Sequence, residues 1–176
     1  MINVFVRTIS PKSRLRQVFL DATIARWGMD KQALVVVMLN KGIREARLEA
    51  ERLSHSDPYI FTDDDVVIVG KDWIARGCAA MTRHHDYAIC SSNSLLAGEA
   101  HPCEGEIYPM HSVGAPMFIR KGILKDDLPE MTLQSESAVL DDYVRKKGFK
   151  EGIISGLSHN HLGHGFSSTP GLDFGA

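Results

Sequence analysis

The hydrophobic positions of the chain fall into short β-branched runs that alternate with longer segments of helical periodicity. The first run, Ile2 to Arg7, ends at the loop residues Thr8 and Ser10 and is typical of a buried strand. From Pro11 to Trp27 the apolar side chains recur at near-helical spacing, and Gly28 ends this helix. The chain therefore begins with a strand followed by a helix.

The pattern repeats further along. Leu34 to Leu39 contains three successive valines and predicts a strand covered on both faces. After the turn at Asn40 to Gly42, the segment Ile43 to Leu53 is rich in Ala, Arg, Glu and Leu, which favours a second crossover helix. A third short strand, Tyr59 to Phe61, leads directly into three consecutive aspartates that begin at Asp63. This order predicts an α/β fold with a mostly parallel sheet flanked by helices.

The second half of the chain has weaker signals. The expected elements are a helix over Lys71 to Met81, a strand over Tyr87 to Ser91, a mobile loop over Ser92 to Tyr108, a strand over Ser112 to Arg120, a helix over Ser135 to Lys147 ended by Gly148, and a strand over Ile153 to Leu157. We expect a single compact domain over residues 1–166, followed by a flexible tail over residues 167–176.

Composition narrows the class of protein only slightly. The formal net charge of −2 gives no global signal for nucleic acid or acidic membranes. Three cysteines without a C-x-x-C pair fit neither a disulfide framework nor a zinc ribbon. The N-terminus resembles no signal peptide, and no apolar stretch approaches the ~20 residues of a membrane span. We therefore expect reduced thiols and a cytoplasmic protein.

The three aspartates Asp63, Asp64 and Asp65 are the strongest chemical signal. Adjacent carboxylates repel one another unless a cation or strong hydrogen bonds compensate. Ligands of open α/β sheets bind beyond the carboxyl ends of the strands, which is where these aspartates fall. Oxygen ligands of this kind suit Mg²⁺ or Mn²⁺. The alternative is a solvated acidic turn that caps the next helix, but the position after a buried strand favours a metal site.

Several segments resemble known motifs. Tyr59 to Asp65, followed by Gly70 to Ile74, resembles the Asp-x-Asp motif and following helix of the family 2-like glycosyltransferases of the GT-A fold. Asn40 to Arg47 is similar to the Asn-x-Gly…Ala-Arg segment of that family, and Val113 to Arg120 resembles its acceptor-side Gly-Gly-x-x-x-x-x-Arg strand.

Two further segments follow in the order of the family. Tyr143 to Phe149 resembles the Arg-Leu-Arg-x-x-Gly-Tyr segment, and His159 to His164 matches the C-terminal histidine motif. Together the five segments cover nearly the whole chain. The resemblance implies a GT-A, Rossmann-like domain that transfers a sugar from a nucleotide-diphosphate donor, with a UDP-sugar favoured, to an acceptor hydroxyl with inversion.

The resemblance also implies roles for particular residues. The implied metal ligands for Mn²⁺ or Mg²⁺ are Asp63, Asp65, His161 and His164, with His161 ranked first among the histidines. The implied donor-binding residues are Arg7, Thr8, Ser10, Asn40, Gly42, Arg47, Asp63 and Asp64. The implied acceptor-binding residues are Trp73, Gly114 and Ala115. Structural alternatives remain: a strand terminus for Arg7, a helix salt bridge for Arg47, and a core position for Trp73.

An inverting enzyme needs a base for the acceptor proton. The family supplies a Glu-Asp pair before the last helix, whereas this chain has Glu136 followed by Ser137. Glu136 is the candidate base, with Asp141 and Asp142 as substitutes, and the alternative is that Glu136 only caps the helix. A second departure is that the chain lacks the strand with an acidic turn that the family places before its Asn-x-Gly segment.

Two other functions stay open at this stage. A sugar nucleotidyltransferase would also use carboxylates and a metal, but the segment Thr8 to Lys12 is a poor version of its glycine-rich phosphate loop. A non-catalytic nucleotide- or carbohydrate-binding module would explain the serine at the usual aspartate position. The candidate acceptors are a glycan, a small molecule and a modified nucleic acid, and basic clusters such as Lys12 to Arg16 are compatible with the last.

Overall fold

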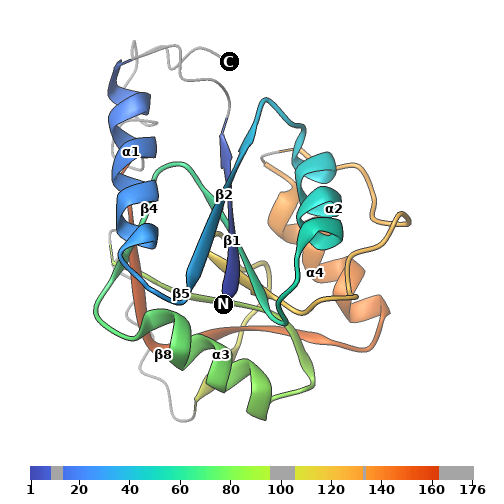
Figure 1. Cartoon of the computed structure of the whole chain (residues 1–176). Helices are drawn as coiled ribbons and strands as arrows, with labels where there is room; N and C mark the ends of the chain where they lie inside the picture. Colours follow the sequence, from blue (N-terminus) through green and yellow to red (C-terminus); the bar gives the residue numbers. More distant parts are fainter. Residues whose placement is uncertain (9–13, 96–105, 133, 163–176) are drawn as a thin grey trace.

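A mixed sheet of eight strands runs through the molecule in the order β2-β1-β3-β7-β5-β8-β4, with β6 paired to β8 (Figure 1). The computed structural model describes residues 1–8, 14–95, 106–132 and 134–162. The strands are β1 (Ile2–Thr8), β2 (Ala33–Leu39), β3 (Tyr59–Asp63), β4 (Val66–Val69), β5 (Tyr87–Ser94), β6 (Ile107–Pro109), β7 (Met117–Ile119) and β8 (Lys150–His161). The helices are α1 (Arg14–Gly28), α2 (Ile43–Leu53), α3 (Trp73–Arg83) and α4 (Glu136–Lys146).

The strand directions confirm the predicted mostly parallel α/β sheet. β1 is parallel to both β2 and β3, and β5 is parallel to β8. β7 lies between β3 and β5 and is antiparallel to both, so β5 and β8 point the same way as β1. Only β4, β6 and β7 run in the opposite direction within the described sheet. The carboxyl ends of β1, β2, β3, β5 and β8 therefore meet at one edge.

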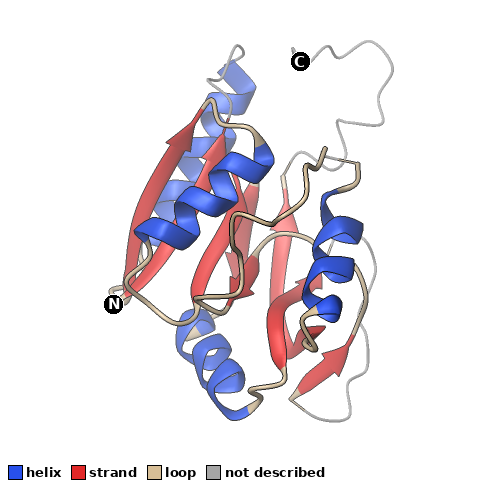
Figure 2. Cartoon of the chain, turned by 90° about the vertical axis from the view of Figure 1, so that its right-hand side faces the viewer, coloured by secondary structure: helices blue, strands red, loops and turns tan. Residues whose placement is uncertain are grey.

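Helices cover both faces of the sheet (Figure 2). The core on one face joins Phe5 and Phe61 of the sheet to Ala46 of α2 and Leu140 of α4. The core on the other face is formed with apolar side chains of α1 and α3, among them Leu20, Trp27, Trp73, Ile74 and Met81. This two-sided burial fits the apolar composition of β1 and β3, because strands covered on both faces have little need for polar side chains.

The α3 helix lies very close to β7. Trp73 is 1% exposed, stacks on Phe118 with ring centroids 4.7 Å apart, and meets Trp27 edge-on at 5.2 Å. Gly77 faces the same phenylalanine ring, and a Cβ atom at this position would lie 1.9 Å from Cζ of Phe118. Glycine is therefore required for the helix to approach the sheet this closely.

The structure corrects several expectations from the sequence. β2 is a strand as predicted, but it lies at the end of the sheet with Leu34, Val37 and Leu39 exposed, so it is not covered on both faces. The predicted loop from Ser92 contains the end of β5 and the start of β6. The strand predicted over Ser112 to Arg120 is limited to β7.

The last strand differs most from its prediction. β8 was expected over Ile153 to Leu157 but extends from Lys150 to His161, bending at Gly156, which has φ +70°. Its C-terminal half pairs with β4, an element that the sequence did not predict. The tail over residues 167–176 lies outside the described residues. No helix in the described part of the chain is long and apolar enough to cross a membrane.

Candidate functional site

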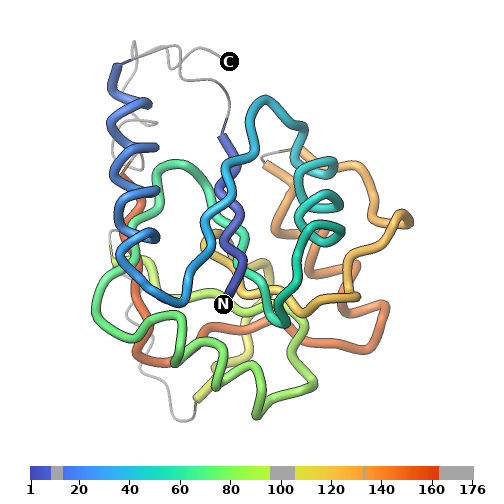
Figure 3. Tube along the Cα trace, in the orientation of Figure 1, coloured from blue at the N-terminus to red at the C-terminus, as the bar shows by residue number. Residues whose placement is uncertain are grey.

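A small cavity lies at the sheet edge where the parallel strands end. Its volume is 170 Å³. The residues that line it are Arg7, Thr8, Arg16, Asp63, Asp64, Asp65 and His161. All three aspartates therefore face one cavity, together with two arginines and a histidine. Figure 3 shows the chain passing from β3 through the aspartate turn into β4 beside α1.

Asp64 connects the aspartate turn, residues 63–65, to β1 and α1 through hydrogen bonds and an ion pair. The hydroxyl of Thr8 donates a short hydrogen bond to Oδ2 of Asp64, and Nε of Arg16 lies 3.9 Å from the same oxygen. The backbone carbonyl of Asp64 accepts a 3.0 Å hydrogen bond from the Thr23 hydroxyl. Burial raises the pKa of Asp64, and its contacts with Thr8 and Arg16 oppose this rise. Asp64 therefore fixes the shape of the turn that carries its two neighbours.

Asp63, at the end of β3, is affected by charges on α2 and α4 as well as by those of the cavity. Burial, together with the negative charges of Glu136 and Asp65, raises the pKa of its carboxyl to about 6, and Arg7 and Arg47 oppose this rise. Three carboxylates thus share a confined region with two guanidinium groups. Such crowding of negative charge is relieved by a bound cation.

Arg47 is the most deeply buried charge of this region. It is 1% exposed, its Nε donates a 2.6 Å hydrogen bond to Oε1 of Glu136, and its guanidinium lies 4.3 Å from the centroid of the Phe61 ring. One guanidinium nitrogen, Nη1, is buried without a hydrogen-bond partner among the described atoms, as is Nε of Arg7. The ion pair between Arg47 and Glu136 therefore holds Glu136, the first residue of α4, near Asp63 of the aspartate turn.

Asp65 faces His161 across the cavity. Nδ1 of His161 lies 3.6 Å from Oδ1 of Asp65, and Nε2 lies 3.1 Å from the carbonyl oxygen of Ala115. Because a carbonyl oxygen can only accept, Nε2 carries a proton, and Nδ1 faces Asp65: it donates to this carboxylate when the ring is protonated and presents a lone pair when the ring is neutral. Burial lowers the pKa of His161, but the nearby carboxylate of Asp65 outweighs this effect and gives a net rise.

This arrangement fits a divalent cation. Within the described residues, no group of three or more His, Cys, Asp or Glu side chains forms a complete metal cluster. Mg²⁺ and Mn²⁺ sites in nucleotide enzymes typically use one or two protein ligands, with phosphate oxygens and water completing the shell. Asp65 and His161 supply such a pair, and the Ala115 carbonyl holds the histidine in the tautomer that a metal requires.

The other histidines of the C-terminal motif differ from His161. His159 is 3% exposed and accepts or donates a 2.8 Å hydrogen bond through Nδ1 with the Ser92 hydroxyl. Burial, and to a smaller extent His161, lowers the pKa of His159 to about 3, so this ring is a neutral core residue. His164 lies outside the described residues, as does Ser10.

The remaining predicted residues are distributed as follows. The backbone N–H of Asn40 donates a 3.0 Å hydrogen bond to the Thr8 carbonyl, which joins the ends of β1 and β2. Gly42 is exposed and lies just before the first residue of α2. Gly114 is exposed beside Ala115 in the segment that contacts His161. For Trp73, burial in the core supports the structural alternative over contact with an acceptor.

The two substitute bases are engaged elsewhere. Oδ1 of Asp141 lies 3.1 Å from Nδ1 of His111, and its Oδ2 lies 3.6 Å from Arg145. Asp142 is paired with Lys146 on the exposed face of α4. Glu136, in contrast, carries a charge that acts on Asp63.

Two residues of this region were not predicted from the sequence. Arg16 lines the cavity, although its only sequence signal was membership of a basic cluster that is more often a solvated helix face. Glu151 is 3% exposed beneath the segment before β7 and accepts a 3.2 Å hydrogen bond from the Val113 N–H. Its Oε1 has no partner among the described atoms, and burial raises its pKa to about 8.

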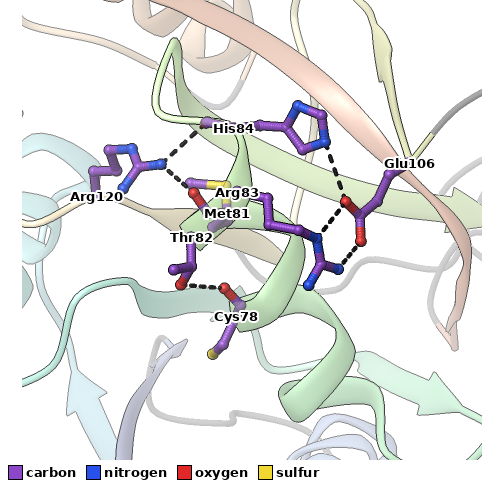
Figure 4. A network of polar contacts seen from close by, with 7 residues as sticks. All are labelled: Cys78, Met81, Thr82, Arg83, His84, Glu106 and Arg120. Atoms are coloured by element: carbon purple, nitrogen blue, oxygen red, sulfur yellow. Dashed lines mark hydrogen bonds and ion pairs between the residues drawn. The ribbon is translucent and has the colours of Figure 1, made fainter.

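Arg120, which ends the segment resembling the acceptor-side strand, has a structural role (Figure 4). Its guanidinium donates hydrogen bonds to the carbonyl oxygens of Tyr87, Met81 and His84, the last at 3.0 Å. It therefore satisfies carbonyl groups at the C-terminal end of α3. Beside it, Glu106 joins Arg83 and His84 of the same helix end.

Comparison with known proteins decides the fold. No protein-family model matches the sequence, and no curated protein matches it. Among solved structures, S. aureus TarS 1–349 is similar, with a TM-score of 0.61 and 14% identity over 92% of this chain and 60% of that chain. The chain has the GT-A fold. A197 from STIV is similar with a TM-score of 0.55 and 17% identity, covering 92% of this chain and 85% of that chain.

A third similar structure is a complex with a nucleotide sugar. TarS 1–349 in complex with UDP-GlcNAc has a TM-score of 0.54 and 13% identity, over 93% of this chain and 60% of that chain. This chain thus spans about three fifths of the length of TarS 1–349. Likeness at such low identity shows the GT-A fold, and the activity has to be argued from the site.

Proposed function

We propose that this GT-A chain is a metal-dependent glycosyltransferase that moves a sugar from a nucleotide-diphosphate donor, with a UDP-sugar favoured, to an acceptor hydroxyl with inversion. The observation that carries the proposal is the position of Nδ1 of His161 facing the Asp65 carboxylate at the edge where the parallel strands end. The UDP-GlcNAc complex of a protein with this fold supports the choice of donor class. Mn²⁺ or Mg²⁺ is the proposed cofactor, with Asp65 and His161 as ligands and Asp63 beside them.

The cation, when bound, offsets the negative charge that develops on the departing nucleoside diphosphate. In the transfer, the acceptor oxygen forms a bond to the anomeric carbon while the bond from that carbon to the diphosphate oxygen breaks. Arg7 and Arg16 line the same cavity and add positive charge for the diphosphate. Asp64 holds the turn in place through Thr8 and Thr23.

Glu136 is the proposed base. It stands at the start of α4, and its charge reaches Asp63. In the transfer it would take the proton of the acceptor hydroxyl as the new bond forms. Arg47 positions this carboxylate through the hydrogen bond from its Nε to Oε1 of Glu136.

The experiment is a turnover assay that measures release of the nucleoside diphosphate, with Mn²⁺, a panel of UDP- and GDP-sugars, and glycan, small-molecule and hydroxylated nucleic-acid acceptors. Glu136→Gln should lower kcat by about 10²- to 10⁴-fold and leave UDP affinity unchanged. Asp142→Asn, which alters a solvent-exposed carboxylate on the same helix, should leave both unchanged. Equal turnover by wild type and Glu136→Gln would exclude Glu136 as the base.

One observation favours a second candidate, a non-catalytic nucleotide- or carbohydrate-binding module. Glu136 already accepts hydrogen bonds from Arg47, and Ser137 stands where the resemblance places an aspartate. For such a module, UDP would bind with Mn²⁺, but no donor and acceptor pair would give turnover above the level without protein.

A further inference from the structure

The two end strands of the sheet are protected in different ways. At one end, β4 is four residues long and packs against α1. Nε of Arg26 donates a 2.9 Å hydrogen bond to the Ile68 carbonyl, and the same side chain bonds the Gly70 carbonyl. A short strand guarded by a charged side chain is a usual defence against edge-to-edge association.

At the other end, β2 has no such defence. It is seven residues long and contains neither a charged residue nor a proline, and among the described strands it pairs with β1 alone. Figure 1 shows β2 in front of β1 at this end of the sheet. A long, uncharged edge strand is a template for another strand.

The backbone of β2 presents free hydrogen-bonding groups. Asn40 N–H bonds the Thr8 carbonyl, and the Gln32 carbonyl accepts from Ile2, so the even-numbered residues direct their backbone groups to β1. Alternation along a strand then directs the N–H and C=O groups of Val35, Val37 and Leu39 away from the sheet. These groups have no partner among the residues that the structure describes.

The exposed side chains of β2 lie on both faces of the sheet. Val35 packs with the α1 core and Val36 with the α2 core, so odd-numbered residues face α1 and even-numbered residues face α2. Val37 and Leu39 are 37% and 53% exposed on the first face, and Leu34 is 48% exposed on the second. A strand added beside β2 would cover these exposed side chains on both faces of the sheet.

We infer that β2 is the interface of a homodimer, in which antiparallel pairing of β2 with β2 of a second copy joins the two sheets. Self-pairing opposes like charges wherever a strand is charged, and β2 carries none, so self-pairing over Ala33–Leu39 brings no like charges together. With the two-fold axis at Val36, Val35 of one copy lies opposite Val37 of the other. Each such pair exchanges two backbone hydrogen bonds, and the apolar side chains meet one another.

The proposal is independent of the activity and is tested on the 176-residue chain by sedimentation velocity over a concentration series. Wild type should approach twice the 19.5 kDa of one chain as concentration rises. Val37→Lys should remain at one chain mass throughout. Val69→Lys, the same change at a residue of β4 that is 39% exposed, should behave as wild type. Hydrogen exchange at the amides of Val35, Val37 and Leu39 should be slow in the dimer and fast in the Val37→Lys chain.

Circular dichroism checks the fold of each variant, and Leu39→Lys at the exposed end of β2 replaces Val37→Lys if the latter unfolds. A wild-type chain that stays at one chain mass over the whole series overturns the proposal. So does a folded Val37→Lys or Leu39→Lys chain that dimerises as well as wild type. Equal loss of the dimer in Val69→Lys also overturns it, because the effect would then not belong to β2.

Discussion

Arg47 of α2 and Glu136 of α4 form a buried ion pair, with Nε of the arginine 2.6 Å from Oε1 of the carboxylate. The pair joins two helices on one face of the sheet and stands beside Asp63. It therefore connects the stability of the fold to the geometry of the site. Removing one partner leaves the other charge buried without compensation.

A double-mutant cycle measures this coupling. Glu136→Gln and Arg47→Met should each lower the free energy of unfolding by about 3 to 5 kcal/mol, and the double variant should lose clearly less than the sum, because no unpaired charge remains. Urea denaturation of the four proteins gives the coupling. The exposed pair Asp142 and Lys146, changed to Asn and Met, is the control and should show almost none. Additive losses at Arg47 and Glu136 would mean that the two side chains do not interact in solution.

Glu151 makes stability depend on pH. Burial raises its pKa from 4.5 to about 8, so between these values the folded chain holds a proton that the unfolded chain has lost. The free energy of unfolding should therefore fall as pH rises from 4.5 to 8, with a slope of at most about 1.4 kcal/mol per pH unit from this group. Asp63, whose pKa is raised to about 6, contributes to the same fall at the acidic end.

Glu151→Gln isolates the first contribution, since its amide oxygen can still accept from the Val113 N–H. Urea denaturation between pH 5 and pH 8 should show a flatter profile for this variant than for wild type, with the gain in stability greatest at pH 8. Parallel profiles for the two proteins would show that Glu151 titrates at its ordinary value.

The contact of Gly77 with Phe118 predicts an unusual outcome for a helix substitution. Gly77→Ala should destabilise the fold by about 1 to 3 kcal/mol, although alanine favours helix, because the new methyl group would overlap the phenylalanine ring. Gly28→Ala, at a helical glycine with no atom within 4 Å of the added Cβ, should leave stability unchanged or raise it. Thermal unfolding of the two variants makes the comparison, and a stabilising Gly77→Ala would show that α3 does not pack this closely.

Local patterns were sufficient for the first half of the fold. The β-branched runs and the helical periodicity between them depend on neighbouring residues, and β1, α1, β2, α2 and β3 lie close to where they were expected. The exposure of β2 could not be predicted, because valine-rich runs look alike whether or not another strand lies beside them. The edge is exposed because β2 pairs with β1 and no further strand of the described chain follows it.

Long-range pairing explains what the sequence did not reveal. β4 has only four residues and is held by pairing with the distant end of β8, where Val66 lies opposite His161. That pairing places Asp65 beside His161, which the resemblance suggested and spacing alone could not show. Glu151 is one of many carboxylates in the chain, and only its position beneath Val113 distinguishes it.

The most direct test of the proposed site is calorimetric titration of UDP into the protein with Mn²⁺ and with EDTA. Wild type should bind UDP with Mn²⁺ and at least tenfold more weakly with EDTA. Asp65→Asn should show the weak affinity under both conditions, whereas Asp142→Asn should match wild type. UDP binding that is equally tight with Mn²⁺ and EDTA, or an Asp65→Asn variant that keeps the full response to Mn²⁺, would contradict the assignment of Asp65 and His161 as a metal site.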